Sequence, residues 1–211
     1  MSTVLVFDVE TAPIANAADY LEPATAPSNY VKQEAIDAYI AKANAETLAK
    51  AALDIDIARI VCLGIDDGSG SLCATAQTED EERELLIAFW LRLIGPKLRP
   101  TLIGFNCLGF DLPVLLRRSL YLDVKAPKLQ IGRYRHDGII DLMQELSFDD
   151  IGRRKKLSFY AKRLGLDAPK DEHSGADIGA LVAAGNFDAV AAHCRADVAT
   201  TVALAKRMGV M

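Results

Sequence analysis

VLVFDVET, residues 4–11, is a β-prone apolar run that leads into Asp8 and Glu10. Successive side chains of a strand point to opposite faces, so Asp8 and Glu10 share one face. Charges on a buried strand cost several kcal/mol unless they are paired or bound to a metal ion. The alternative is a partly exposed strand end with solvated acids. The stretch therefore predicts a first strand that carries two carboxylates on one face.

Two further segments place acids beside predicted elements. LIGFNCLGFDLPVL, residues 102–115, predicts a strand over 101–106 and a helix over 111–120 that begins at Asp111. A capping role would by itself explain an Asp at a helix start. AAHCRADVATT, residues 191–201, predicts a helix in which His193 lies one turn before Asp197. A surface pair at i,i+4 spacing would explain this segment taken alone.

The remaining pattern predicts an α/β fold. Strands are expected over 59–66 and 71–77 as a hairpin, and helices over 79–94, 138–146, 157–164 and 187–207. Thr78 and the acids after it suit the start of the helix over 79–94, which favours capping over metal binding for that acidic run. Three antiparallel strands, then a helix, a strand and more helices, are the order of an RNase H-like mixed sheet flanked by helices.

Residues 12–58 differ from the rest of the chain and contain 15 alanines. Prolines near the start predict a loop, and apolar residues at helical spacing over 30–53 predict one or two helices. We therefore expect a single domain over 1–211 with a helical insertion at about 12–58. The insertion follows the first strand directly, and a lid and a partner-binding helix are its two alternative roles.

In their order, the three acidic segments resemble the three motifs of the DEDD (DnaQ-like) exonuclease superfamily. The motifs are F-D-x-E-T at 7–11, N-x-x-x-F-D-x-P at 106–113, and an aromatic residue four positions before Asp197. KKLSFYAKRLGLDAPK, residues 155–170, is similar to the corresponding stretch of family-B DNA polymerase exonuclease domains. The chain most resembles the stand-alone predicted 3′–5′ exonucleases related to that polymerase domain. The resemblance covers most of the chain outside the insertion.

The resemblance implies a site for two divalent metal ions. Asp8 would bridge both ions, Glu10 and Asp197 would complete one site, and Asp111 would hold the second ion through water. Clustered carboxylates repel one another, and they stay ionised together only around cations. Hard oxygen ligands suit Mg²⁺ or Mn²⁺ better than zinc. Two such ions roughly 4 Å apart stabilise both the attacking water and the leaving 3′-oxygen.

The same resemblance implies residues that grip the terminal nucleotides: the backbone near Thr11 and the side chains of Asn106 and Phe110. A plain core position is the alternative for Phe110. His193 departs from the family, which has Tyr four residues before the last Asp in one branch and His five residues before it in the other. Because imidazole titrates near neutral pH, we hypothesise that His193 is the general base. His136 and His173 lie in polar segments and are not expected to act directly.

The charge of the chain limits the classes of partner. A net charge of −5 argues against a protein that coats nucleic acid without specificity. Residues 111–170 nevertheless contain 13 Lys and Arg against 8 Asp and Glu, which suits a basic rim beside an acidic site. Solvated helix faces are the alternative. No apolar run approaches a membrane span and no leader pattern is evident, so a cytoplasmic location without a membrane partner is expected.

The four cysteines, Cys62, Cys73, Cys107 and Cys194, are scattered in the sequence without a C-x-x-C pair. Zinc and disulfide interpretations are therefore weak, and buried or half-buried free thiols are expected.

The expected activity is hydrolysis of single-stranded DNA from the 3′ end, with release of nucleoside monophosphates. An exoribonuclease on the same scaffold is an alternative, because the metal site does not distinguish the sugars. Two further alternatives are a catalytically weak nucleic-acid-binding module and a subunit that supports a polymerase or repair partner.

Overall fold

A computed structural model describes residues 4–94, 99–132, 136–167, 169 and 173–211. Its centre is one five-stranded sheet in the order β3-β2-β1-β4-β5. The strands are β1 (Val4–Pro13), β2 (Ala58–Asp66), β3 (Ser71–Thr75), β4 (Thr101–Gly104) and β5 (Ile139–Asp141). β1, β2 and β3 pair antiparallel, whereas β4 and β5 continue the sheet in parallel from β1. This is the mixed α/β sheet that the sequence predicts.

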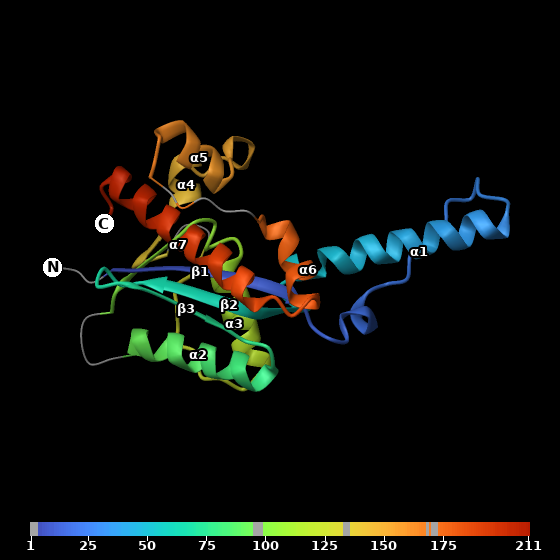
Figure 1. Cartoon of the computed structure of the whole chain (residues 1–211), viewed down its shortest axis with the longest axis horizontal. Helices are drawn as coiled ribbons and strands as arrows, with labels where there is room; N and C mark the ends of the chain where they lie inside the picture. The colour runs from blue at the N-terminus through green and yellow to red at the C-terminus, as the bar shows by residue number, and fades with distance from the viewer. Residues whose placement is uncertain (1–3, 95–98, 133–135, 168, 170–172) are drawn as a thin grey trace.

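Helices cover both faces of the sheet (Figure 1). The α-helices of the described residues are α1 (Gln33–Lys50), α2 (Glu79–Ile94), α3 (Asp111–Tyr121), α4 (Leu142–Ser147), α5 (Leu157–Leu164), α6 (Ile178–Ala183) and α7 (Phe187–Met208). Leu5, Phe7 and Val9 of β1 pack with the apolar residues of α2 and α3, whereas Val6 packs with those of α7. The alternation of β1 therefore turns the face of Asp8 and Glu10 toward α7.

The segment 138–146, predicted as a helix, is a strand followed by a helix. Ile139 and Ile140 extend beside β4, and the helix begins only after Asp141. The Asp141 carboxylate accepts the N–H groups of Met143 and Gln144, which caps α4. The prediction was wrong here because three residues of parallel strand are too few to show a period. α6 was not predicted as a separate helix.

The Ala-rich insertion contains the predicted helical segment as one long helix, α1, which projects from the body of the protein as an arm (Figure 1). None of its 18 residues is buried. A small apolar cluster of Ala17, Ala51 and Ile57 packs at the base of the arm. The predicted insertion overlaps both strands, because β1 continues through Pro13 and β2 begins at Ala58.

The acidic run in the first turn of α2 has the capping role expected of it, with one addition. The N–H of Glu81 donates to the Thr78 hydroxyl, and the Glu81 carboxylate accepts the N–H groups of Gln77 and Thr78. Glu82 instead points into the core, where it is fully buried and holds both Nε and a terminal nitrogen of Arg118 at 2.8 Å. Arg118 was counted toward the basic rim, but it lies in the core and cannot contact a substrate.

Candidate active site

Asp8 and Glu10 project from β1 on the face covered by α7, Asp8 half-buried and Glu10 buried. The register between β1 and β2 shifts between Glu10 and Thr11, so the ladder is irregular beside these acids. Gly64 of β2 lies opposite Asp8, and a Cβ there would come within 2.8 Å of both Cys194 and Val198 of α7. The glycine therefore allows α7 to approach the acidic face closely.

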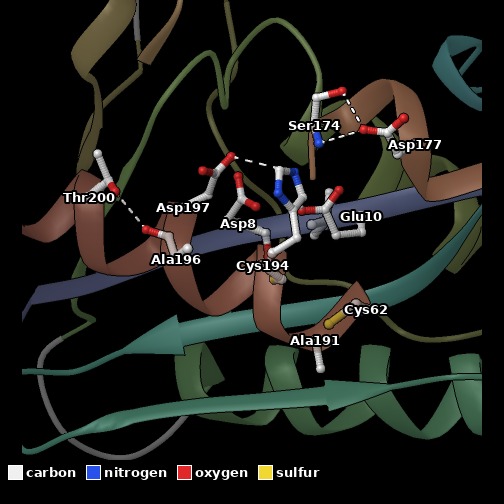
Figure 2. A network of polar contacts seen from close by, with 12 residues as sticks. Asp8, Glu10, Cys62, Ser174, Asp177, Ala191, Cys194, Ala196, Asp197 and Thr200 are labelled. Atoms are coloured by element: carbon white, nitrogen blue, oxygen red, sulfur yellow. Dashed lines mark hydrogen bonds and ion pairs between the residues drawn. The ribbon is translucent and has the colours of Figure 1, made fainter. Parts of the chain in front are cut away.

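His193 and Asp197 face these acids from α7. The Nε2 of His193 lies 3.6 Å from the Oε1 of Glu10 and 4.0 Å from the Oδ2 of Asp197. His193 is only 5% exposed, which rules out the solvated surface pair as the explanation of this segment. Figure 2 shows Asp8, Glu10 and Asp197 gathered where α7 crosses β1, with Cys194 beside them.

Asp111 joins the site from the start of α3 and is buried. It does not cap its own helix, for which Phe110 is the N-cap residue. Its Oδ1 instead accepts the N–H of Val9 at 3.2 Å, between the two acids of β1. β1 pairs with β4 only from Val4 to Val6. The N–H of Val9 lies beyond this pairing, and the Asp111 carboxylate accepts it instead.

Mutual repulsion and burial dominate the electrostatics of the four carboxylates. Burial, followed by the charges of Glu10, Asp111 and Asp197, raises the pKa of Asp8 well above its usual range. Burial also raises the pKa of Asp111 to about 7, although backbone N–H donors oppose the change. The negative charges of the four carboxylates therefore repel one another. A bound cation would offset this repulsion.

The donor set fits hard divalent cations. Ligand atoms of Glu10, His193 and Asp197 lie within 4.8 Å of one another, and so do those of Asp8, Glu10 and Cys194. Carboxylate oxygens predominate, which suits Mg²⁺ or Mn²⁺. Asp8, Glu10 and Asp197, which the sequence predicts as metal ligands, belong to these groups, whereas Asp111 belongs to neither.

The loop before α3 presents the predicted nucleotide-binding residues. Asn106 adopts a left-handed conformation with φ 64°, and its N–H donates to the Asp141 carboxylate. A Cβ on Gly109 would meet the Asn106 Oδ1 at 2.5 Å, so the loop leaves room for this amide only because residue 109 is glycine. Phe110 is half-buried. The Thr11 hydroxyl donates to the carbonyl of Ala52, and the residue is buried.

Asp141 is a site-organising residue that the sequence did not reveal. Its side chain accepts four backbone N–H groups: two from the loop before α3, at Asn106 and Leu108, and two from α4. Asp141 is 3% exposed, so it acts on the loop and not on a substrate. Its position after two isoleucines was the available signal, but the segment was predicted as helix.

Three of the cysteines that are scattered in the sequence meet in the fold. Cys62, Cys73 and Cys194 have sulfur atoms within 4.8 Å of one another, and all four cysteines are free thiols. Hydrogen bonds from Cys194 and then Cys62 lower the pKa of Cys73 to about 4. The burial of these thiols agrees with the prediction, but their clustering was not foreseen.

The raised pKa of Asp111 predicts an inverted pH dependence for the metal-free protein. A carboxyl that titrates near pH 7 when folded and at 3.8 when unfolded binds protons more tightly in the folded state. Its contribution to stability therefore grows as the pH falls from about 7 to about 4. In EDTA, we expect the melting temperature to rise between about pH 8 and pH 5 by roughly 4–8 °C more in the wild type than in Asp111→Asn. Equal rises measured by calorimetry would contradict the assignment.

Sequence comparisons relate this chain to known proteins. A family model for predicted 3′–5′ exonucleases related to the exonuclease domain of PolB matches residues 52–211. An uncharacterized protein of Methanocaldococcus jannaschii is 33% identical over 141 residues, which cover 62% of this chain and 74% of that protein. Among the helices of the described residues, none is both long and apolar enough to cross a lipid bilayer.

A family B DNA polymerase from the hyperthermophilic archaeon Pyrobaculum calidifontis has a similar fold, with a TM-score of 0.62 at 16% identity. The match covers 99% of this chain but only 24% of the polymerase, so the chain spans about a quarter of that protein. This similarity confirms the RNase H-like fold class and includes β1, which lies outside the family match. The match over residues 52–211 shows that the chain belongs to the family of predicted 3′–5′ exonucleases related to the exonuclease domain of PolB.

Proposed function

We propose that the chain is a two-metal-dependent 3′–5′ exonuclease that hydrolyses single-stranded DNA and releases nucleoside monophosphates. The observation that carries the proposal is the convergence of Asp8, Glu10, Asp111 and Asp197 from β1, α3 and α7 on one site. Family membership supports nuclease activity in general and a nucleic acid as the substrate class. The metal stoichiometry, the sugar preference and the roles of single residues are parts of the proposal.

Asp8, Glu10, Asp111 and Asp197 would hold two Mg²⁺ or Mn²⁺ ions. When bound, these ions supply positive charge to the attacking water and to the leaving 3′-oxygen. Their ligands are already positioned: β1 fixes Asp8 and Glu10 on one face, and the Val9 N–H holds the Asp111 carboxylate. Such preorganisation lets the carboxylates receive the cations without a rearrangement of the backbone.

His193 is proposed as the general base, with Nε2 accepting a proton from the attacking water. The Nε2 atom faces Glu10 and Asp197 at 3.6 and 4.0 Å, so a water molecule held by these acids would be within its reach. The low exposure of the imidazole keeps bulk water away from it. His193 stands four residues before Asp197, where one branch of the family has tyrosine, and its imidazole has a geometry suited to proton transfer.

The substrate strand would be gripped by the loop before α3 and by the basic segment that leads into α5. Phe105 stacks edge-on against Tyr160 at 6.2 Å, which places α5 beside that loop. The apolar side of α5 packs toward α7, and the four consecutive cations at 153–156 are exposed. Phe159 is 47% exposed. Exposed cations beside an aromatic ring suit a single strand, whose phosphates and bases they can contact.

The function is tested with 5′-labelled single-stranded DNA, the same sequence as RNA, and a duplex with a mismatched 3′ end. Each is incubated with Mg²⁺, Mn²⁺ or EDTA. We expect a ladder that shortens from the 3′ end on single-stranded DNA with either metal, and none in EDTA. If RNA is shortened faster than DNA, the chain is an exoribonuclease and the proposed DNA preference is contradicted. Binding without cleavage under every condition would overturn the enzyme assignment.

The role of His193 predicts a loss in the chemical step alone. In His193→Gln we expect kcat to fall by about 10²–10⁴-fold, because a positioned base contributes on that order. The Mg²⁺ concentration for half-maximal activity should stay unchanged, since the base is not a ligand. His136→Ala is the control, because the His136 ring hydrogen-bonds to the backbone carbonyl of Ile139. A higher Mg²⁺ requirement in His193→Gln would show instead that His193 binds the metal.

A further inference from the structure

Three thiols from three different elements meet beside the acidic residues of β1, on the face of the sheet that α7 covers. Cys62 lies on β2, Cys73 on the edge strand β3, and Cys194 on α7. The sulfur atoms of Cys62 and Cys73 are 3.1 Å apart, and all three sulfurs lie within 4.8 Å of one another. Segments separated by more than 100 residues thus bring a complete three-sulfur donor set to one point.

The spacing of these sulfurs is close to that around a bound metal ion. Thiolates that surround Zn²⁺ tetrahedrally at about 2.3 Å stand roughly 3.8 Å from one another. The sulfurs here span 3.1 to at most 4.8 Å, so each needs to move by no more than about an ångström. Cys62 and Cys194 are buried, whereas Cys73 on the edge strand is half-buried and gives an ion a route in from solvent.

We propose that Cys62, Cys73 and Cys194 bind one thiophilic cation, Zn²⁺ or Cu⁺, at a site separate in chemistry from the carboxylates. The three thiols would release their protons to solvent as three metal–sulfur bonds form, with no change in oxidation state. Soft sulfur donors select such ions, and hard oxygen donors select Mg²⁺ or Mn²⁺. The two donor sets therefore take different metals, although Cys194 also lies within 4.8 Å of Asp8 and Glu10.

A disulfide between Cys62 and Cys73 is the competing use of these thiols. In the β2–β3 register, Cys62 pairs with Thr75 and Cys73 with Gly64, so the two cysteines are diagonal neighbours. Diagonal neighbours stand roughly 7–8 Å apart, beyond the Cα separation of about 4.4–6.8 Å in disulfides. A disulfide would also leave Cys194 without a use, whereas a metal ion takes all three sulfurs.

Such a site would fix α7 to the sheet at the turn that carries the active-site residues. Cys194 directly follows His193, and its sulfur lies 3.8 Å from the carbonyl oxygen of Asp8. The Cys73 sulfur also lies 3.5 Å from the carbonyl of Ala191, one turn earlier on α7. Figure 2 shows Cys194 and Ala191 of α7 close to Cys62 of β2. The thiol site is therefore structural, and its existence does not depend on the proposed function.

The test is a titration of metal-stripped, reduced full-length protein with Co²⁺, with saturating Mg²⁺ present to occupy the carboxylates. We expect thiolate-to-cobalt charge-transfer absorption that saturates at one equivalent and is displaced by one equivalent of Zn²⁺. A parallel titration with Cu⁺ in the absence of oxygen distinguishes the two candidate ions. The absorption should be lost in Cys73→Ser and kept in Cys107→Ser, because Cys107 is also a free thiol but lies outside the cluster. Zn²⁺ should raise the melting temperature of the wild type and not that of Cys73→Ser.

The wild-type titration decides the proposal even if a cysteine variant fails to fold. Absence of thiolate charge-transfer bands with Co²⁺, together with no stoichiometric binding of Cu⁺, overturns it. So does a Cys62–Cys73 disulfide found by peptide mapping of protein kept without reductant. Circular dichroism shows whether Cys73→Ser is folded, and Cys73→Ala is the second variant if it is not.

Discussion

Asp8→Asn is expected to lower turnover by at least about 10³-fold, roughly 4 kcal/mol of transition-state stabilisation. Asp8 lies centrally among the acids, since Glu10, Asp111 and Asp197 all raise its pKa. The amide keeps the shape of the side chain but removes the charge that would hold the cations. The measurement is single-turnover cleavage of 5′-labelled single-stranded DNA in Mg²⁺.

The same substitution is expected to leave the metal-free protein folded, and more stable than the wild type at neutral pH. It removes a carboxylate that burial and three like charges destabilise. Asp188→Asn is the matched control, because Asp188 is an exposed acid on the same helix as Asp197. If Asp8→Asn is nearly as active as the control, the two-metal mechanism is contradicted. If the variant loses both activity and its fold, Asp8 is needed for stability and the loss of activity says nothing about metal binding.

Arg118→Met is expected to lower the free energy of unfolding by about 3–5 kcal/mol, because it leaves Glu82 charged and fully buried without its partner. Urea denaturation measures this change. Arg117→Met is the matched control: its ion pair with Asp56 is half-exposed, and its loss should cost less than about 1 kcal/mol.

A double variant separates the ion pair from the packing of its side chains. Glu82→Gln combined with Arg118→Met keeps an acceptor for the N–H of Ile60 and removes both charges. We expect it to be more stable than Arg118→Met alone, because no unpaired charge remains in the core. Equal stability of the single and double variants would show that lost packing, and not the buried charge, accounts for the effect.

Strong local patterns predicted most of the elements correctly. α5 ends at Leu164 as predicted, because Gly165 adopts a left-handed conformation with φ 60° that stops the helix. α7 was predicted to within one residue from its apolar spacing. β5 was not, because its three residues owe their conformation to β4 beside them and not to any pattern of their own.

Local sequence patterns predicted four of the five strands, the face of β1 that carries Asp8 and Glu10, and the motifs through which the family is recognised. These follow from local periodicity and from side-chain chemistry, which the chain carries wherever it folds. Only the tertiary structure decided that Asp111 binds the Val9 N–H, that Arg118 lies in the core, and that the three thiols meet. Such contacts join segments far apart in the chain, and their distances depend on how α7 and α3 pack on the sheet. Packing of that kind leaves no periodic signal in the sequence.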